Sequence, residues 1–377
     1  MTAAPLELLR SAKRIVVKIG SALVAEAGEA RQDWLNSLAL DIASWRKAGQ
    51  DVILVSSGAI ALGRNHLGSE RPRKLEEKQA AAALGQPLLM ASMAQAFAHH
   101  DVSVAQTLLT LEDTESRRRW LNARATLETL INAGAVPVIN ENDSVATDEI
   151  RYGDNDRLAA RVAQMMGADV LILLSDVDGL YTADPHRSPQ ATHIPIVQTL
   201  TDQISAMAGD SNRDADVGSG GMATKLIAAQ IAQSAGCATV ITQGDRDRPL
   251  SALVEGARAT WILSDMTPES ARQIWLKGHL SPEGVLIVDA GAANALRSGA
   301  SLLPVGVTAA QGQFLRGAAV AIKGPDGAQI AKGITAYSSE DVMRIAGLQS
   351  DQIEQELGFR GRPAIVHRDD LFLEVKP

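Results

Sequence analysis

The sequence has one cysteine, Cys237, among 377 residues. A single thiol excludes both a disulfide within the chain and a cysteine zinc cluster, and it fits a reducing compartment. No apolar run approaches the roughly 18 residues that a membrane-spanning helix needs. The N-terminal segment 1–20 carries charges within its first apolar patch, unlike a signal peptide. We therefore expect a cytoplasmic protein with no membrane partner.

An excess of positive charge is also missing, because the formal net charge is −8. Proteins that coat nucleic acid usually show a basic surface, so the charge argues against that class. The composition, 46% hydrophobic and 21% charged, is that of an ordinary globular protein. A chain of this length usually forms more than one hydrophobic core, which indicates two domains.

Short apolar segments rich in valine and isoleucine alternate with helix-length segments through the first two thirds of the chain. Nearly continuous apolar runs are typical of parallel strands that helices cover on both faces. The predicted fold class is α/β, a three-layer α/β/α sandwich with a mainly parallel sheet. The predicted strands are 14–20, 51–57, 136–140, 169–175 and 238–243, and the predicted helices are 31–47, 76–99, 117–132, 154–166 and 221–235.

Residues after position 265 have a different pattern, with short strands separated by Gly, Pro and Asp-Gly turns. That pattern predicts a small β-rich barrel. The expected domains are therefore 1–265 and 281–377.

Small or polar residues follow nearly every predicted strand of the first domain, among them Ser57, Asn140 and Ser175. Ligands of such sheets bind beyond the carboxyl ends of the strands, and the following helix N-termini favour anions. Two lysines fit an anion there. Lys18 lies within a predicted buried strand, where an unpaired charge is costly, and Lys225 follows the glycine-rich segment 218–221 near a helix start, where the helix dipole opposes a cation.

Structural explanations for both lysines stay open. Lys18 could snorkel from the edge of a sheet, and the glycine-rich segment before Lys225 could be a flexible linker. Two such lysines with carboxylates nearby nevertheless favour phosphoryl transfer, which mainly requires charge to be positioned and neutralised.

Amides and carboxylates gather in the segment 139–163. Residues 140–143 follow a predicted strand, and residues 154–156 stand at a predicted helix start, where an N-cap would account for one of the three. The concentration indicates a zwitterionic small molecule, with acceptors for an ammonium and donors for a carboxylate. The segment 173–185 predicts a nucleotide-facing loop, although its Asp178-Gly179 pair is also common in turns. The segment 56–60 alone fits a simple packing turn.

Together these motifs resemble the amino-acid kinase family, and within it the members that phosphorylate glutamate. The resemblance covers nearly the whole chain, including an ending like that of bacterial members with a PUA domain. It is most specific where INENDSVAT is followed by GDND. The segments that carry it are VVKIGSALV, VSSGAIALG, RWLNARATLETLI, VPVINENDSVAT, GDNDRLAA, LLSDVDGLYTADPH and GSGGMATKLIAA.

The resemblance implies a role for each matched residue. Lys18 and Lys225 would bracket the transferred phosphoryl group, and Asp156 would hold both lysines. Ser57, Asp143 and Asn155 would bind glutamate. ATP would be bound by Lys18, Ser175, Asp176, Ser219, Gly220, Gly221, Met222, Ala223, Thr224 and Lys225. No protein ligand to a metal is implied, because Mg²⁺ would bridge the phosphates of ATP.

The implied reaction is transfer of phosphate from ATP to the γ-carboxylate of L-glutamate, the first step of proline biosynthesis. That carboxylate is already ionised at neutral pH, so no general base is required. Relatives imply proline as feedback inhibitor, a homo-oligomer (dimer or tetramer), and hand-over of γ-glutamyl phosphate to the next enzyme. Arg151 stands where relatives often have lysine, which puts the affinity for glutamate or an inhibitor in doubt.

The C-terminal module resembles a PUA domain, a fold common on RNA-modifying enzymes. Residues 281–377 contain 9 Lys+Arg and 11 Asp+Glu, a net charge of −2, which is a poor footprint for binding an RNA backbone. We expect a structural or regulatory role and no RNA partner. The alternatives are an RNA-binding protein with a degenerate kinase domain and a non-enzymatic amino-acid sensor, the second disfavoured by the intact lysine pair.

Overall fold

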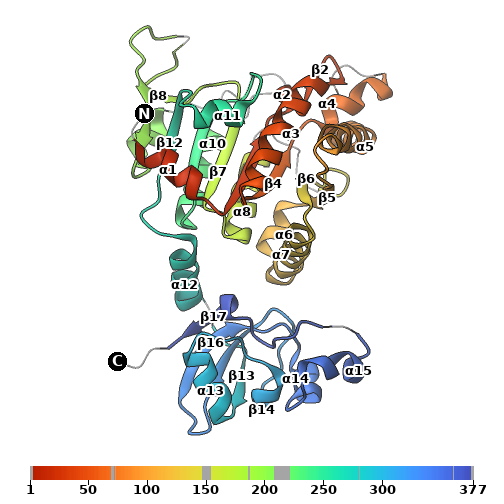
Figure 1. Ribbon diagram of the computed structural model, residues 1–377, viewed down its shortest axis with the longest axis vertical. Helices are drawn as coiled ribbons and strands as arrows, with labels where there is room; N and C mark the ends of the chain where they lie inside the picture. Colours follow the sequence, from red (N-terminus) through yellow and green to blue (C-terminus); the bar gives the residue numbers. More distant parts are fainter. Residues whose placement is uncertain are drawn as a thin grey trace. The chain divides into compact units, whose positions relative to one another are not determined.

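The five segments predicted as strands form the centre of one eight-stranded sheet in the computed structural model (Figure 1). The structure describes residues 3–68, 72, 74–146, 154–185, 187–207, 221–279, 281–359 and 361–374. It divides into two units, Met1–Glu269 and Ser270–Pro377. Among the described helices, none combines the length and apolar character needed to span a membrane.

The sheet of the first unit is mainly parallel, as predicted. Its strands are β1 (Arg14–Ile19), β4 (Asp51–Ser56), β5 (Val104–Leu109), β6 (Val136–Glu141), β7 (Val170–Ser175), β10 (Ile196–Val197), β11 (Ala238–Gln243) and β12 (Ala259–Ile262). The order is β10-β12-β11-β7-β1-β4-β6-β5, and only the β11–β12 pair is antiparallel. Two short ribbons add β2 (Ala25–Glu26) to β3 (Glu29–Ala30) and β8 (Leu180–Tyr181) to β9 (His193–Ile194).

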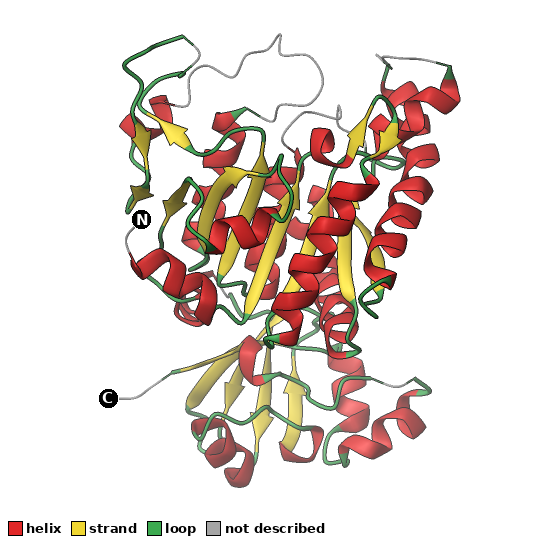
Figure 2. Cartoon of the chain, turned by 45° about the horizontal axis from the view of Figure 1, so that its top comes forward, coloured by secondary structure: helices red, strands yellow, loops and turns green. Residues whose placement is uncertain are grey.

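Helices cover both faces of this sheet (Figure 2). They are α1 (Ala3–Ser11), α2 (Ser21–Val24), α3 (Gln32–Lys47), α4 (Ala59–Gly63), η1 (Arg64–Leu67), α5 (Leu75–Ala98), α6 (Leu111–Glu115), α7 (Arg117–Asn132), α8 (Asp154–Met166), α9 (Asp202–Met207), α10 (Met222–Ser234) and α11 (Pro249–Val254), with α12 (Pro268–His279) at the division between the units.

The alternation of side chains along β1 separates two hydrophobic layers. Val17 packs in one cluster with Leu38 of α3, and Val16 packs in the other with Leu158 of α8. Because successive strand residues point to opposite faces, Lys18 lies on the same face as Val16. The backbone therefore directs the Lys18 side chain toward the layer that holds α8 and α10.

The second unit is β-rich, as predicted. Its sheet has the order β14-β13-β15-β16-β17, in which only the β13–β15 pair is parallel. Its elements are β13 (Gly284–Val288), α13 (Ala290–Arg297), η2 (Pro304–Gly306), β14 (Val307–Gln311), β15 (Ala319–Lys323), β16 (Gln329–Ile334), α14 (Ser339–Ile345), η3 (Ser350–Gln352), α15 (Ile353–Leu357), η4 (Arg368–Asp370) and β17 (Leu371–Leu373).

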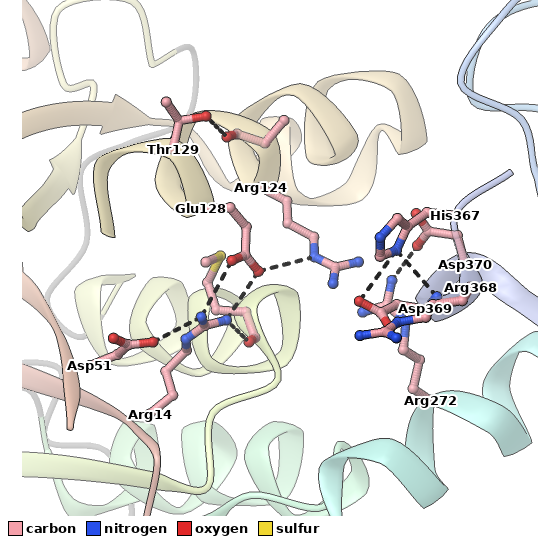
Figure 3. A network of polar contacts seen from close by, with 12 residues as sticks. Arg14, Asp51, Arg124, Glu128, Thr129, Arg272, His367, Arg368, Asp369 and Asp370 are labelled. Carbon is pink, nitrogen blue, oxygen red and sulfur yellow. Dashed lines mark hydrogen bonds and ion pairs between the residues drawn. The ribbon is translucent and has the colours of Figure 1, made fainter. Parts of the chain in front are cut away.

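Partly buried ion pairs occur within each unit (Figure 3). In the first unit, the guanidinium of Arg14 lies 3.0 Å from Asp51 and 3.1 Å from Glu128, joining the start of β1 to β4 and α7. In the second unit, Asp370 accepts a hydrogen bond from Arg272.

Cys237, immediately before β11, is completely buried, and burial raises the pKa of its thiol far above the ordinary value.

Candidate active site

Two lysine ammonium groups share one buried carboxylate at the carboxyl ends of the central strands. Lys18 Nζ lies 2.6 Å from Asp156 Oδ1, and Lys225 Nζ lies 3.7 Å from Asp156 Oδ2. All three side chains are buried, and that of Asp156 has no exposed surface. Two ammonium groups and one carboxylate, contributed by a strand and two helices, therefore lie within contact distance and carry a net charge of +1.

The first turns of α8 and α10 place two of these groups. Asp156 lies in the first turn of α8, and Lys225 lies in the first turn of α10, whose N-cap is Gly221. Thr224 Oγ1 donates a hydrogen bond of 3.0 Å to Asp156 Oδ2 and also contacts the carbonyl oxygen of Gly221, at 2.8 Å. This threonine therefore fastens the start of α10 to the shared carboxylate.

Opposing effects set the protonation of this cluster. Burial by itself would raise the pKa of Asp156, but the charges of Lys18 and Lys225 outweigh burial and lower that pKa below its ordinary value. Burial lowers the pKa of Lys225, and the charge of Lys18 acts in the same direction, against the attraction of Asp156 and Asp176. Lys225 therefore holds its proton less tightly than an exposed lysine does.

A chain of side-chain amides lies beside the cluster. Asn155 Nδ2 donates to Ser57 Oγ at 2.8 Å and to Asn140 Oδ1 at 3.2 Å. Asn140 Nδ2 in turn donates to Gln86 Oε1 on α5 at 2.8 Å. The structure thus brings together Ser57 and Asn155, two of the residues assigned to the amino acid. Asp143, the third, is buried in the segment after β6.

Residues assigned to the nucleotide lie at the ends of β7 and α10. Ser175 ends β7, is buried, and its hydroxyl donates to Asp176 Oδ1 at 2.8 Å. Met222, Ala223 and Thr224 form the first turn of α10. Ser219 and Gly220 lie outside the described residues, as does Arg151.

The turn after Asp176 is held by contacts within the protein. Asp178 accepts hydrogen bonds from Tyr181 Oη at 2.9 Å and from the guanidinium of Arg258 at 3.3 Å. Gly179 has a φ of +147°, and a Cβ there would lie 2.5 Å from His193 Nε2. Asp178 and Gly179 therefore determine the shape of this turn, and the pair has the structural role that Asp-Gly pairs commonly have in turns.

Gln86 is the site residue that the motif analysis did not select. It lies in a helix that is rich in alanine and leucine, and its side chain is buried between turns that also bury Ala82 and Leu89. A polar residue at helical spacing within an apolar stripe is the signal that would have found it, because buried amides require partners.

The described side chains offer Mg²⁺ few possible protein ligands in this region. Among the described side chains, no group of three or more His, Cys, Asp and Glu residues could hold a metal ion. Mg²⁺ commonly binds through substrate phosphates, one or two carboxylates and water. The donors present, such as Asp176, fit an ion that arrives with a polyphosphate.

The chain matches known proteins over nearly its full length. A model of the amino acid kinase family matches residues 13–243, and a model of the PUA domain matches residues 284–357. A glutamate 5-kinase from Caulobacter vibrioides (strain NA1000 / CB15N) is 56% identical over 374 residues, covering 98% of this chain and 99% of that protein.

Another relative is a glutamate 5-kinase from Paramagnetospirillum magneticum (strain ATCC 700264 / AMB-1), 55% identical over 97% of this chain and 99% of its own length. Among solved structures, a carbamate kinase from Giardia lamblia bound to AMP-PNP is 19% identical, with a TM-score of 0.49. It covers 68% of this chain and 100% of its own.

Proposed function

The chain belongs to the amino acid kinase family and, within it, to the glutamate 5-kinases, and on this basis we propose that it transfers the γ-phosphoryl group of ATP to the γ-carboxylate of L-glutamate. The observation that carries the proposal is the buried Asp156 between Lys18 and Lys225 beside a chain of amides. This site combines a place for transferred phosphate with groups that suit an amino acid.

In the proposed reaction, an oxygen of the glutamate γ-carboxylate forms a bond to the γ-phosphorus of ATP. The bond from that phosphorus to the β,γ-bridging oxygen breaks, and ADP leaves with the electron pair. Lys18 and Lys225 offset the negative charge of the phosphoryl oxygens in the transition state. Asp156 holds both ammonium groups in place, and no residue has to remove a proton because the carboxylate is already ionised.

The binding roles follow the chemistry of each group. Asp143 and Asn155 Oδ1 would accept hydrogen bonds from the glutamate ammonium, while the hydroxyl of Ser57 would donate to a glutamate carboxylate. Ser175, Asp176 and the segment 219–225 would bind ATP, through backbone N–H groups at the start of α10 and through Lys225. Mg²⁺, when bound, would neutralise phosphate charge through ATP oxygens.

Further proposals concern the regulation of the enzyme, the roles of its two domains and its partners. We propose that proline inhibits by competing for the glutamate groups, that residues 1–265 carry out catalysis and that 281–377 have a structural or regulatory role. Hand-over of γ-glutamyl phosphate to the next enzyme and a cytoplasmic location stay predictions.

Self-association is supported by the outward side of α5, where Leu84 and Leu88 are 42% and 38% exposed. Ala91, one turn further along the helix, extends this apolar side. If a second copy covers it, Leu84→Lys should lower the mass measured by light scattering; an unchanged mass would contradict this interface.

A coupled assay of ADP release tests the reaction. Glutamate, aspartate and N-acetylglutamate are compared as acceptors, each with and without proline. Turnover with glutamate supports the proposal. Turnover with aspartate or N-acetylglutamate alone contradicts it, as would salt-dependent RNA binding without any ATP turnover.

A further inference from the structure

Gln86 ends a continuous chain of hydrogen bonds that starts at Ser57. The chain runs from Ser57 Oγ through Asn155 and Asn140 to Gln86 Oε1, with donor–acceptor distances of 2.8, 3.2 and 2.8 Å. Gln86 and Asn140 are 8% and 2% exposed, so water competes little for these bonds. Gln86 reaches the chain from α5, whereas Ser57, Asn140 and Asn155 come from the edge of the sheet and from α8.

The direction of each bond depends on which way the Asn140 amide faces. Its Oδ1 accepts from Asn155 Nδ2 and also from the backbone N–H of Glu141, at 2.9 Å. Its Nδ2 must then face α5, where Gln86 Oε1 is the acceptor. A flipped Asn140 would set its NH₂ against two donors, so the acceptor on Gln86 favours the orientation that Asn155 needs.

Two buried atoms of this chain have no hydrogen-bond partner among the described residues. They are Gln86 Nε2, a donor, and Asn155 Oδ1, an acceptor. Buried polar atoms are nearly always paired, and leaving one unpaired is costly. A ligand with both a carboxylate and an ammonium supplies an acceptor and a donor, so the chain matches a free amino acid.

We propose that Gln86 is a positioning residue of the amino-acid site: by accepting from Asn140 it fixes the amide of Asn155, and through it the hydroxyl of Ser57, in the orientation that receives glutamate. This inference rests on the proposed function for the identity of the amino acid. Gln86 acts through Asn140, and the lysine cluster is held independently by Asp156. Loss of Gln86 therefore affects glutamate binding more than ATP binding.

Gln86→Met tests the proposal, because methionine preserves length and volume but neither accepts from Asn140 nor donates. We expect the KM for glutamate to rise about tenfold, the size of one lost buried hydrogen bond, with the KM for ATP unchanged. Gln203→Met is the control for the same type of substitution, since Gln203 is exposed on α9, away from the amide chain, and it should leave both constants unchanged. Gln86→Asn, one methylene too short to reach Asn140, should behave like Gln86→Met and serves if that variant does not fold.

A double-variant cycle shows whether Gln86 acts through Asn140. If it does, adding Gln86→Met to Asn140→Ala raises the KM for glutamate little further, because the chain is already broken. An unchanged KM for glutamate in Gln86→Met and Gln86→Asn overturns the proposal. Equal rises in both KM values with a lowered melting temperature also overturn it, because Gln86 would then stabilise the fold rather than position the glutamate-binding groups. Wild-type enzyme without glutamate turnover instead refutes the proposed function, so the two failures are distinguishable.

Discussion

Lys18 Nζ and Asp156 Oδ1 lie 2.6 Å apart, although one residue belongs to the central strand β1 and the other to the first turn of α8. Neither side chain has appreciable contact with solvent. A buried charge is tolerated when it is paired, and removing one partner leaves the other uncompensated. Here the carboxylate compensates two ammonium groups at once.

Asp156→Asn should therefore lower kcat by about 100-fold or more, a typical loss when a group that organises transition-state charge is removed. The amide keeps the shape of the side chain but leaves two ammonium groups facing each other. Steady-state kinetics at saturating glutamate and ATP measure the effect. Asp33→Asn, at an exposed position on α3, is the control, and wild-type kcat in Asp156→Asn would contradict the assigned role.

The alkaline side of the pH–activity profile should be set by Lys225. Its pKa is lowered from the ordinary value of 10.5, mainly by burial, so its proton leaves at a lower pH than that of an exposed lysine. Activity should decline as pH rises through this lowered pKa, because the neutral amine no longer offsets phosphate charge. Arginine stays charged in this range, so Lys225→Arg should shift the alkaline decline upward. An unchanged decline in that variant would assign it to another group.

Asp41→Ala should destabilise the first unit by about 2 kcal/mol, because the lost carboxylate leaves backbone N–H groups without their acceptor. Asp41 on α3 is buried and accepts from Arg248 Nε at 2.6 Å and from the backbone N–H groups of Leu250 and Ser251 at 2.9 and 3.0 Å. Arg248 itself adopts a left-handed backbone conformation, at a φ of +51°. Denaturant unfolding measures the loss. Asp33→Ala serves as the exposed comparison, and equal stability of the two variants would refute the prediction.

Gly179→Ala should raise the KM for ATP and lower the melting temperature. The new Cβ would lie 2.5 Å from His193 Nε2 and 2.6 Å from Thr260 Oγ1, so the turn that carries Asp178 would have to move. Gly49→Ala isolates the backbone contribution, because Gly49 also has a positive φ, +86°, but nothing lies within 4 Å of the added atom. If both variants lose the same stability and keep the wild-type KM, the turn does not face the nucleotide.

The five strands found from the sequence are the five central ones, which are both buried and long enough to form an apolar run. β12 is also buried, but it has only four residues. β1 and β7 are covered on both faces and read as continuous apolar runs. β5 lies at the edge of the sheet and is only partly buried, so its sequence VAQTLL lacks that signature. β10 at the other edge has two residues, too few for any pattern.

The site was predictable where a residue is unusual for its surroundings. Lys18 in a buried strand and the polar residues after β6 pointed to the site because such groups need partners. Gln86 could have been selected as a polar residue within an apolar stripe, but its partner could not have been predicted. Its partner Asn140 follows only from the packing of α5 against the end of β6, a contact between segments that no local pattern relates.

The buried thiol of Cys237 has a practical consequence. Its sulfur has no exposed surface, and burial disfavours the thiolate that reacts with maleimides and disulfides. A cysteine introduced at an exposed position, such as Gln203, would therefore be the single reactive thiol of the folded chain, without removal of the native one. A fluorescent or spin label attached there would report from a known site on an otherwise unmodified enzyme.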